Sequence, residues 1–548
     1  MPVGVVCAGG ALLVWMLVAP RTPDLAAAAY RLNLFKHLGF AVYDEHWYGG
    51  HELPGYSALF PPLAWLLGLR AVGALSVLVS TLCFERLAVA SYGRSARWAA
   101  VPFALAAVGD VWIGRLAFAL GVSFALAALL ANAGAEGSRR GCTALAAVLA
   151  AMCAAASPVA GVLLALAALS ESLWRRSPGP LLVLGLPAAF VVLALGALFG
   201  EGGYEPFPIV SFLATAVVVI AFAAALPAGH GRLRLGAGVY LLACLVFLLV
   251  WTPMGSNVER YGVLLAGPLL LCALASARSA EAASAGQPID PRRNGGSPRG
   301  GSGARGAVTA LAAGAFALWA VWAGWGPLRE TLAVAGSPAT DGAYYAPVER
   351  FLDAHAPGPV RIEVPLTRTH WESAELAPRV SLARGWEKQL DERYNAVLLS
   401  PGLSAASYER WLRDQAVSYV ALPAVELDPS SAREGELIRA GLPYLRLVYS
   451  SSNWRIYAVR APTPLASGPG RVTALGHETV GLTASAPGTL LVRVHYTPYW
   501  SVTRGDGCVE RGADGWTRVD ARRPGPLQLR ASFSLGRAFG AGRSCRSG

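Results

Sequence analysis

Residues 180–199 read PLLVLGLPAAFVVLALGALF, twenty residues without a charged side chain. A helix of about 20 mostly apolar residues is long enough to cross the hydrocarbon core of a bilayer. Comparable stretches recur through the first three-fifths of the chain, so we expect about eleven spans. They lie near residues 2–20, 70–88, 98–110, 113–133, 142–156, 159–174, 180–199, 209–228, 237–252, 261–277 and 307–326.

The overall composition supports this interpretation. Of the 548 residues, 54% are hydrophobic and 15% are charged, whereas soluble domains carry about 25% charged residues. The charges are concentrated after Arg329, where they recur every few residues. The sequence therefore predicts an α-helical polytopic membrane domain followed by a soluble domain.

The arginines between the predicted spans alternate from loop to loop. Intervening short loops hold only Arg115 and Arg260. The other loops hold clusters: Arg86, Arg94 and Arg97; Arg139 and Arg140; Arg175 and Arg176; Arg232 and Arg234; and Arg278, Arg292, Arg293, Arg299 and Arg305. Cytoplasmic loops carry the excess of basic residues. We therefore expect a multi-pass plasma-membrane protein with a cytoplasmic N-terminus, an outside loop at 21–69 and an extracytoplasmic C-terminal domain.

The net charge of +12 does not indicate a nucleic-acid partner. Lysine occurs only at Lys36 and Lys388, so the basic residues are nearly all arginine. Together with the abundant Ala and Gly, this is typical of a GC-rich genome. The sequence shows no helix-turn-helix, RNA-binding or zinc-finger pattern, and the expected partner is the lipid bilayer.

Composition also divides the chain into domains. We expect a transmembrane domain at 1–327, containing a disordered cytoplasmic loop at 279–305 that is rich in Gly, Ser, Pro and Arg. An extracytoplasmic α/β domain at 328–460 follows, because helical patterns alternate there with strand patterns. A β-rich domain at 461–548, with Gly and Pro turns, completes the chain as a β-sandwich. Cys508 and Cys545 lie in this last domain, and the sequence leaves open whether they form a disulfide.

The first outside loop is the most distinctive part of the sequence. Asp24 follows the first span closely, and residues 25–37 have the apolar spacing of an amphipathic helix on the membrane surface. Residues 43–56 then read YDEHWYGGHELPGY. Four carboxylates, three histidines and several aromatics in one loop indicate function. The alternative is a solvated loop whose aromatics form an interfacial belt.

Two short motifs in the long first outside loop resemble those of a known family. They are Trp47-Tyr48-Gly49-Gly50 and Phe60-Pro61-Pro62-Leu63. With the early acidic residue, the further spans and the C-terminal domain, the chain resembles the GT-C glycosyltransferase superfamily over residues 1–460. More narrowly, it resembles bacterial membrane proteins labelled 6-pyruvoyl-tetrahydropterin synthase-related.

The resemblance implies an inverting membrane glycosyltransferase that moves a sugar from a polyprenyl-phosphate donor to a cell-envelope glycan or glycolipid. It implies a general base early in the first loop, which Asp24 matches best, with Asp44 and Glu45 as a second acidic cluster. The alternative for Asp24 is a helix N-cap. Known members carry paired adjacent acids near the first span, and this chain departs from that pattern.

Other residues of the predicted site follow from the same resemblance. Arg115 and Arg260 are candidates for binding the donor phosphate, because guanidinium groups bind phosphate oxygens in a bidentate manner. The alternatives are snorkelling side chains or local ion pairs with Asp110 and Glu259. The expected substrate-loop residues are His46, Trp47, Tyr48, His51 and Glu52.

The histidines and acids of the loop match no standard zinc spacing, so we expect no cofactor and leave a divalent metal open. The sequence contains no GxxxxGK[ST], GxSxG or HExxH motif, which removes support for nucleotide-driven transport and for common hydrolase mechanisms. Two other functions remain as alternatives. One is a non-enzymatic membrane protein of envelope assembly, and the other is a lipid flippase or transporter.

Overall fold

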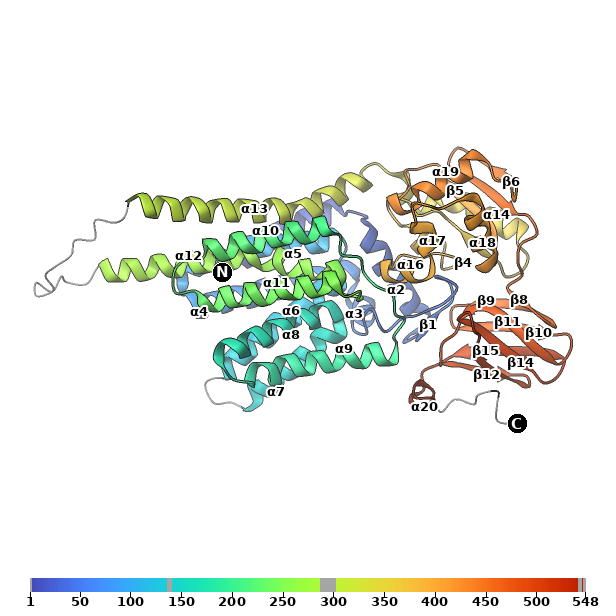
Figure 1. The fold of residues 1–548 in the computed structure, drawn as a ribbon, viewed down its shortest axis with the longest axis horizontal. Coiled ribbons are helices and arrows are strands. Elements are labelled where there is room, and N and C mark those ends of the chain that lie inside the picture. The colour runs from blue at the N-terminus through green and yellow to red at the C-terminus, as the bar shows by residue number, and fades with distance from the viewer. Residues whose placement is uncertain (1, 136–139, 286–301, 541–544, 546–548) are drawn as a thin grey trace, which may run out of the picture. The chain divides into compact units, whose positions relative to one another are not determined.

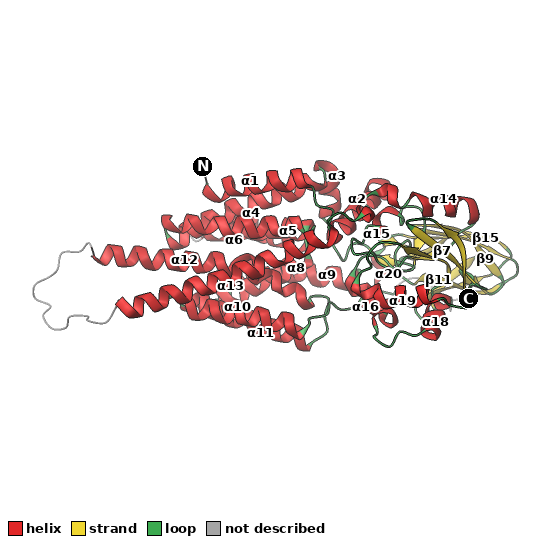
Figure 2. Ribbon diagram, turned by 90° about the horizontal axis from the view of Figure 1, so that it is seen from above, coloured by secondary structure: helices red, strands yellow, loops and turns green. Residues whose placement is uncertain are grey.

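The structure is a computed structural model that describes residues 2–135, 140–285, 302–540 and Cys545. The chain divides into two compact units. The helical unit comprises Met1–Pro20, Ser57–Ala194 and Glu205–Thr331, and the mixed unit comprises Arg21–Tyr56, Leu195–Tyr204 and Leu332–Gly548. Figure 2 shows the strands in yellow, and all described strands belong to the mixed unit.

The helical unit is built from long apolar helices, several of which run side by side (Figure 1). Its helices are α1 (Val3–Val18), α3 (Phe60–Leu67), α4 (Leu69–Tyr92), α5 (Ala100–Trp112), α6 (Leu116–Ala135), α7 (Arg140–Ala156), α8 (Pro158–Arg175), α9 (Leu186–Leu198), α10 (Ile209–Ala225), α11 (Gly231–Leu249), α12 (Glu259–Ala285) and α13 (Ser302–Val334). Short turns of other helix types precede α5, α9 and α12, at Arg94–Ala99, Leu181–Gly185 and Gly255–Val258. The last residues of α9 and α13 belong to the mixed unit.

Each of the eleven predicted spans corresponds to a helix of the structure. Within the described residues, seven helices are long and apolar enough to cross a membrane, or eight if Val3–Val18 and Pro23–Leu38 form one broken span. The helices α5, α7 and α10 have 13, 17 and 17 residues, fewer than the roughly 20 that a span needs. The count of eleven therefore stays a prediction.

Two pairs of spans that follow each other closely in sequence are separate helices. Residues 113–115 separate α5 from α6, and Ser157 separates α7 from α8. The Ser157 hydroxyl accepts a hydrogen bond from the Ala160 amide, and Pro158 occupies the first helical position, where its missing N–H costs nothing. A short helix that was not predicted, α3, likewise has prolines in its first turn.

The expected disordered loop at 279–305 is shorter in the structure. The helix α12 continues to Ala285 and α13 begins at Ser302. Alanine is the strongest helix former, and four of the seven residues at 279–285 are alanine. The remaining residues of that prediction, 286–301, lie outside the described part of the chain.

In the mixed unit, residues 332–460 form an α/β fold around a five-stranded sheet of order β4-β3-β5-β7-β6. Its strands are β3 (Arg361–Glu363), β4 (Ser381–Leu382), β5 (Val417–Pro423), β6 (Leu445–Ser450) and β7 (Trp454–Val459). Its helices are α14 (Ala346–His355), α15 (Glu372–Glu375), α16 (Lys388–Tyr394), α17 (Ala396–Leu399), α18 (Ala405–Asp414) and α19 (Ala432–Ala440). The strand β3 runs parallel to β4 and β5, whereas β7 runs antiparallel to β5 and β6.

A β-sandwich follows, as the sequence predicts. Its sheets have the orders β12-β15-β10-β9 and β13-β14-β11-β8 and are antiparallel. The strands are β8 (Ala466–Ser467), β9 (Gly470–Gly476), β10 (Thr479–Ala484), β11 (Gly488–His495), β12 (Trp500–Arg504), β13 (Gly507–Arg511), β14 (Trp516–Ala521) and β15 (Gly525–Ala531), before the short helix α20 (Leu535–Ala538). Alternate residues of β11 and β15 are buried in one core, as period-2 patterning requires. A disulfide joins Cys508 to Cys545.

Residues 21–56 of the first loop belong to the mixed unit, although the sequence predicts that this loop is part of the transmembrane domain. The loop contains α2 (Pro23–Leu38) and a two-stranded ribbon of β1 (Tyr43–Asp44) and β2 (His51–Glu52). Val42 and Tyr43 are buried in the core of the β-sandwich. Apolar contacts with residues more than 400 positions away therefore determine where the loop belongs.

Candidate functional site

The helix α2 carries Asp24 in its first turn. The N-cap position is Thr22, and Pro23 is the first helical residue. The alternative role of Asp24 as the N-cap is therefore wrong. A carboxylate in the first turn still interacts favourably with the helix dipole. Asp24 itself is half-buried.

The helix predicted at 25–37 is present, but the prediction that it is amphipathic is wrong, because buried residues lie on all of its sides. Its polar residues bind other parts of the mixed unit. The Tyr30 hydroxyl donates to Asp44 Oδ2 at 2.8 Å, and Arg31 pairs with Glu387 at 2.5 Å. Just before the helix, Arg21 pairs with Glu375 at 2.8 Å and lies over the ring of Trp371. These interactions attach α2 to the α/β fold.

Asp44 is the centre of a buried hydrogen-bond network. Its Oδ1 accepts from Nδ1 of His477 at 2.8 Å and from the His46 amide at 3.1 Å, while Oδ2 accepts from Tyr30. Burial alone raises the pKa of this carboxyl, but the hydrogen bond from His477 and the charge interaction with His51 outweigh burial and lower the pKa to about 2. Asp44 is therefore an ionised acceptor that orients its neighbours.

Glu45 is fully buried and forms an ion pair. Its Oε1 accepts from the Arg361 guanidinium at 2.7 Å and from the Ser381 hydroxyl at 2.9 Å. Arg361 also donates to the main-chain carbonyls of Gln415 and Arg493. This one arginine thus joins the first loop, the α/β fold and the β-sandwich.

The sequence Trp47-Tyr48-Gly49-Gly50 forms a tight turn over this ion pair. Tyr48 has φ of 59°, and a Cβ added to Gly49 would lie 2.8 Å from the Arg361 guanidinium carbon. At Gly50, where φ is 122°, a Cβ would overlap the Tyr43 hydroxyl. The two glycines are therefore explained by close packing.

Trp47 and Tyr48 bind main-chain groups of the α/β fold. The Trp47 indole N–H donates to the Ser373 carbonyl at 2.8 Å, and its ring stacks on Tyr30 at 4.5 Å. The Tyr48 hydroxyl accepts from the Glu387 amide and donates to the Glu387 carbonyl. Both side chains are fully buried, which gives them a structural role in the mixed unit.

The two buried histidines of the loop share one protonation pattern. Nδ1 of His46 lies 2.5 Å from the Ala377 carbonyl oxygen, and Nδ1 of His51 lies 3.2 Å from the Asp44 carbonyl oxygen. A carbonyl only accepts, so Nδ1 carries the hydrogen in both rings. Burial lowers the pKa of each ring, so both are neutral at pH 7 and present Nε2 as an acceptor.

Glu52 is paired with a residue that the sequence analysis did not single out, Glu201. Oε1 of Glu201 accepts from the Glu52 amide at 2.5 Å, and Oε2 accepts from the Tyr394 hydroxyl at 2.8 Å. Oε1 of Glu52 accepts from Thr497 at 2.7 Å. Burial raises the pKa of both carboxyls to about 7, and the charge of Glu52 adds to the effect on Glu201. Such groups exchange protons near neutral pH.

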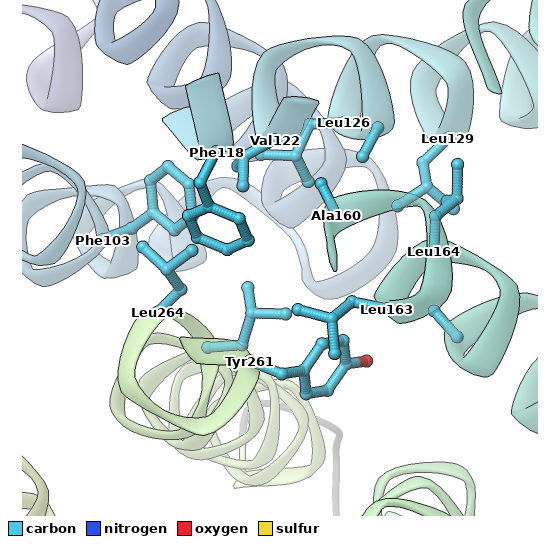
Figure 3. Close-up of a pocket in the computed structure, with 13 residues that line it drawn as sticks. Phe103, Phe118, Val122, Leu126, Leu129, Ala160, Leu163, Leu164, Tyr261 and Leu264 are labelled. Atoms are coloured by element: carbon cyan, nitrogen blue, oxygen red, sulfur yellow. The ribbon is translucent and has the colours of Figure 1, made fainter. Parts of the chain in front are cut away.

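The helical unit contains a cavity of about 80 Å³ with an almost wholly apolar lining. Figure 3 shows the side chains of the lining residues around this cavity. Phe103 comes from α5 and Phe118 from α6, while Leu163 comes from α8 and Tyr261 from α12. Thirteen residues line it, and the Tyr261 hydroxyl is their single side-chain oxygen.

The two arginines expected to bind phosphate lie at helix starts, and Arg260 contacts a residue that lines this cavity. Arg260 is in the first turn of α12, its guanidinium lies 5.0 Å from the ring centre of Phe118, and it donates to the Asn257 side chain. Arg115 immediately precedes α6 and lies 3.5 Å from Asp110, which confirms the local ion pair considered for it. Phe118 and Tyr261, which line the cavity, are thus close in sequence to the two arginines.

Among the described residues, the one group of three potential ligands with suitable spacing is Cys508, Asp520 and Cys545. The two sulfur atoms of that group are bonded to each other, so they are not available as thiolate ligands.

No family model and no curated protein matches the sequence, so the narrower resemblance to the pterin-synthase-related proteins has no support. Similar solved structures include arabinofuranosyltransferase AftD from mycobacteria, with 20% identity and a TM-score of 0.47 over 84% of this chain and 42% of that chain. A second AftD structure has 16% identity and a TM-score of 0.45 over 96% of this chain and 59% of that chain. ArnT from Cupriavidus metallidurans has 16% identity and a TM-score of 0.44 over 83% and 97%. Scores this low do not decide fold or function.

Proposed function

We propose that the chain is a GT-C-type membrane glycosyltransferase that moves a sugar from a polyprenyl-phosphate donor to a glycan or glycolipid of the bacterial cell envelope. One observation carries the proposal. An apolar cavity lies among membrane-type helices, and the guanidinium group of Arg260 lies 5.0 Å from the ring centre of Phe118, which lines that cavity. A lipid phosphate combines the same two chemistries, an apolar chain and an anionic head.

The cavity suits the lipid chain because its lining offers almost no hydrogen-bonding group. Arg260 and Arg115 supply positive charge for the phosphate, and a guanidinium binds phosphate oxygens in a bidentate manner. The positive charge also stabilises the phosphate as it leaves the sugar. We therefore assign donor binding to the helical unit.

Asp24 is the best candidate for the general base. Asp44 and Glu45 are less suitable because both are fully buried. Asp44 accepts three hydrogen bonds, and Glu45 forms an ion pair with Arg361. In the proposed inverting reaction, Asp24 takes the proton of the acceptor hydroxyl as its oxygen attacks the anomeric carbon. The bond from that carbon to the phosphate oxygen breaks, and the phosphate leaves with the electron pair.

The remaining loop residues, His46, Trp47, Tyr48, His51 and Glu52, shape the mixed unit in which Asp24 lies. Of these, Glu52 is a second candidate base, because its pKa of about 7 suits proton transfer at neutral pH. The other four bind main-chain groups of the mixed unit, which supports a positioning role for them.

Sugar transfer by the purified full-length chain in lipid tests the proposal, with a panel of radiolabelled polyprenyl-phosphate sugars and an envelope extract as acceptor. We expect Asp24→Asn to abolish transfer while the protein remains folded and inserted. The comparison variants are Glu52→Gln and the double change Asp44→Asn with Glu45→Gln. Absence of transfer by folded wild type from every donor would favour the envelope-assembly scaffold, and lipid translocation without transfer would favour a flippase.

A second experiment tests the donor site. We expect Arg260→Gln to lower transfer about 10- to 100-fold, because a hydrogen bond between charged groups contributes roughly 1.5–3 kcal/mol. Arg329→Gln is the matched control, because Arg329 is an exposed arginine of the same unit that pairs with Glu330. Equal losses in both variants would show that general positive charge, and not the cavity arginine, matters.

The proposed orientation, with the N-terminus in the cytoplasm and the mixed unit outside, has its own test. The Cys508–Cys545 disulfide is consistent with an oxidising compartment. We expect a maleimide reagent, added to denatured protein from intact cells, to label two more cysteines after reduction than before. Equal labelling would contradict the extracytoplasmic placement.

A further inference from the structure

A polar cavity of about 280 Å³ lies within the mixed unit. Three parts of the unit enclose it: His46 of the first loop, the helix α14 with the loop that follows, and residues 376–381. Leu475 of β9 completes the wall. Ligand pockets typically measure about 300–1,000 Å³, so this cavity suits one small molecule.

His46 provides a buried acceptor in the wall of this cavity. Its side chain is about nine-tenths buried, and its Nδ1–H is already donated to the Ala377 carbonyl. The neutral ring therefore offers Nε2 as a lone-pair acceptor. The orientation is held by Asp44, which accepts from the His46 amide and from His477, whose ring lies 4.0 Å from that of His46.

The charged groups of the cavity are mostly acceptors as well. Arg379 lies 3.2 Å from Glu349, so the two charges largely cancel. Asp353, one turn further along α14, adds a carboxylate at the exposed rim. The net charge of these three side chains is −1, which disfavours a phosphate or another anion.

A second acceptor, the Glu45 carboxylate, lies behind the wall, one hydrogen bond away from a lining residue. Ser381 lines the cavity and donates its hydroxyl to Oε1 of Glu45. Oε2 of Glu45 is fully buried and has no hydrogen-bond partner among the described residues. Glu45 itself does not line the cavity, so the Ser381 hydroxyl is the group of this pair that a ligand can contact.

We propose that this cavity binds a neutral sugar ring of a glycan, separately from the site of sugar transfer. A sugar ring presents several hydroxyl donors to His46, Glu349 and Asp353, and its C–H groups contact apolar wall residues such as Leu475. The chemical class follows from the excess of acceptors, the small volume and the lack of net positive charge. The binding does not require the chain to be a transferase.

Saturation-transfer NMR on the full-length chain in nanodiscs tests this, with methyl glycosides of neutral hexoses and pentoses as probes. We expect at least one glycoside to bind and Asp353→Lys to weaken it about tenfold, since a hydrogen bond to a charged acceptor contributes at least ~1.4 kcal/mol. Glu436→Lys is the matched control, because Glu436 is an exposed acid of α19 that does not line the cavity. A second variant, His46→Phe, removes the buried acceptor, and its melting temperature checks the fold.

The proposal is overturned if no glycoside binds wild type, if binding survives Asp353→Lys unchanged, or if Glu436→Lys weakens it equally. Tighter binding of a polyamine or a divalent cation at the cavity would also overturn the assignment to sugars. Asp24→Asn separates this proposal from the proposed function, because we expect that variant to lose transfer and to keep glycoside binding.

Discussion

The two units of the molecule differ in where their charged side chains lie. The cavity of the helical unit has an apolar lining, and the nearby arginines lie at helix starts. The mixed unit instead encloses whole ion pairs: Arg361 with Glu45, both 0% exposed, and Arg384 with Asp391, at 1% and 5%. The comparison teaches that the mixed unit places oppositely charged side chains against each other in its interior, whereas the cavity of the helical unit is lined by apolar groups.

The outer surfaces differ in the same sense. Large apolar side chains are exposed along the described membrane-type helices, with Leu193 of α9 at 71% and Val210 of α10 at 74%. In the mixed unit such residues are few, and Leu447 of β6, at 51%, is one of them. Exposed apolar surface of this extent is stable in lipid but not in water.

The largest expected effect is on the buried arginine of the mixed unit. Arg384 donates to both oxygens of Asp391 at 3.0 and 2.6 Å and lies 3.4 Å from Glu434. We expect Arg384→Met to lower the free energy of unfolding of the mixed unit by about 3–5 kcal/mol, because it leaves buried carboxylates without a counter-charge. Denaturant unfolding followed by tryptophan fluorescence measures the change.

Arg413→Met is the control for this experiment. Arg413 forms an ion pair with Glu409 one helical turn away, with both side chains more than a third exposed. Exposed pairs of this kind contribute roughly 0.3–0.5 kcal/mol. A similar loss in both variants would mean that burial does not distinguish the two pairs.

Introducing an arginine on the outer surface of each unit tests whether the two surfaces face different environments. We expect Leu193→Arg to make membrane insertion of α9 about 2.5–3.5 kcal/mol less favourable, the amount that an arginine costs at the centre of a spanning helix. An insertion assay with glycosylation tags on either side of the helix measures the change. Leu447→Arg should change the stability of the mixed unit by no more than about 0.5 kcal/mol. Equal tolerance at the two positions would contradict a lipid environment for α9.

The last expected effect is a pH dependence contributed by two carboxyl groups of the mixed unit. The pKa of Glu52 and Glu201 is raised to about 7, above the usual glutamate value of about 4.3. Between these values the folded state binds more protons than the unfolded state, so stability falls as pH rises through 7. Melting temperatures between pH 5 and pH 8 should show this fall.

Replacing both glutamates by glutamine should remove their contribution to the fall, whereas Glu436→Gln should leave the pH dependence unchanged. The lowered pKa of Asp44 acts in the opposite direction, because its contribution is present above its ordinary pKa and is lost as pH falls toward 2. The lowered pKa of His46 and His51 also makes stability rise with pH, so the test is the difference between wild type and the double variant. An identical pH dependence in the two proteins would contradict the protonation assigned to the glutamate pair.

Local patterns predicted the elements well. Within residues 328–460, where the sequence predicts alternating helices and strands, α14 and β7 are examples of each, because hydrophobic periodicity over one segment is sufficient for such assignments. The Glu52–Glu201 pair was missed because its members are 149 positions apart. Glu201 lies in a short loop with Gly202 and Gly203, and no local pattern there indicates burial.

The sequence by itself determined that the first three-fifths of this chain forms apolar membrane-type helices and that the rest folds into α/β and β-rich parts. Those features depend on composition and on periods of a few residues. Only the tertiary structure decided that residues 21–56 belong to the mixed unit, that His46 lines a polar cavity and that Arg361 neutralises Glu45. Burial and pairing depend on residues hundreds of positions apart, and their separation in sequence carries no information about their distance in space.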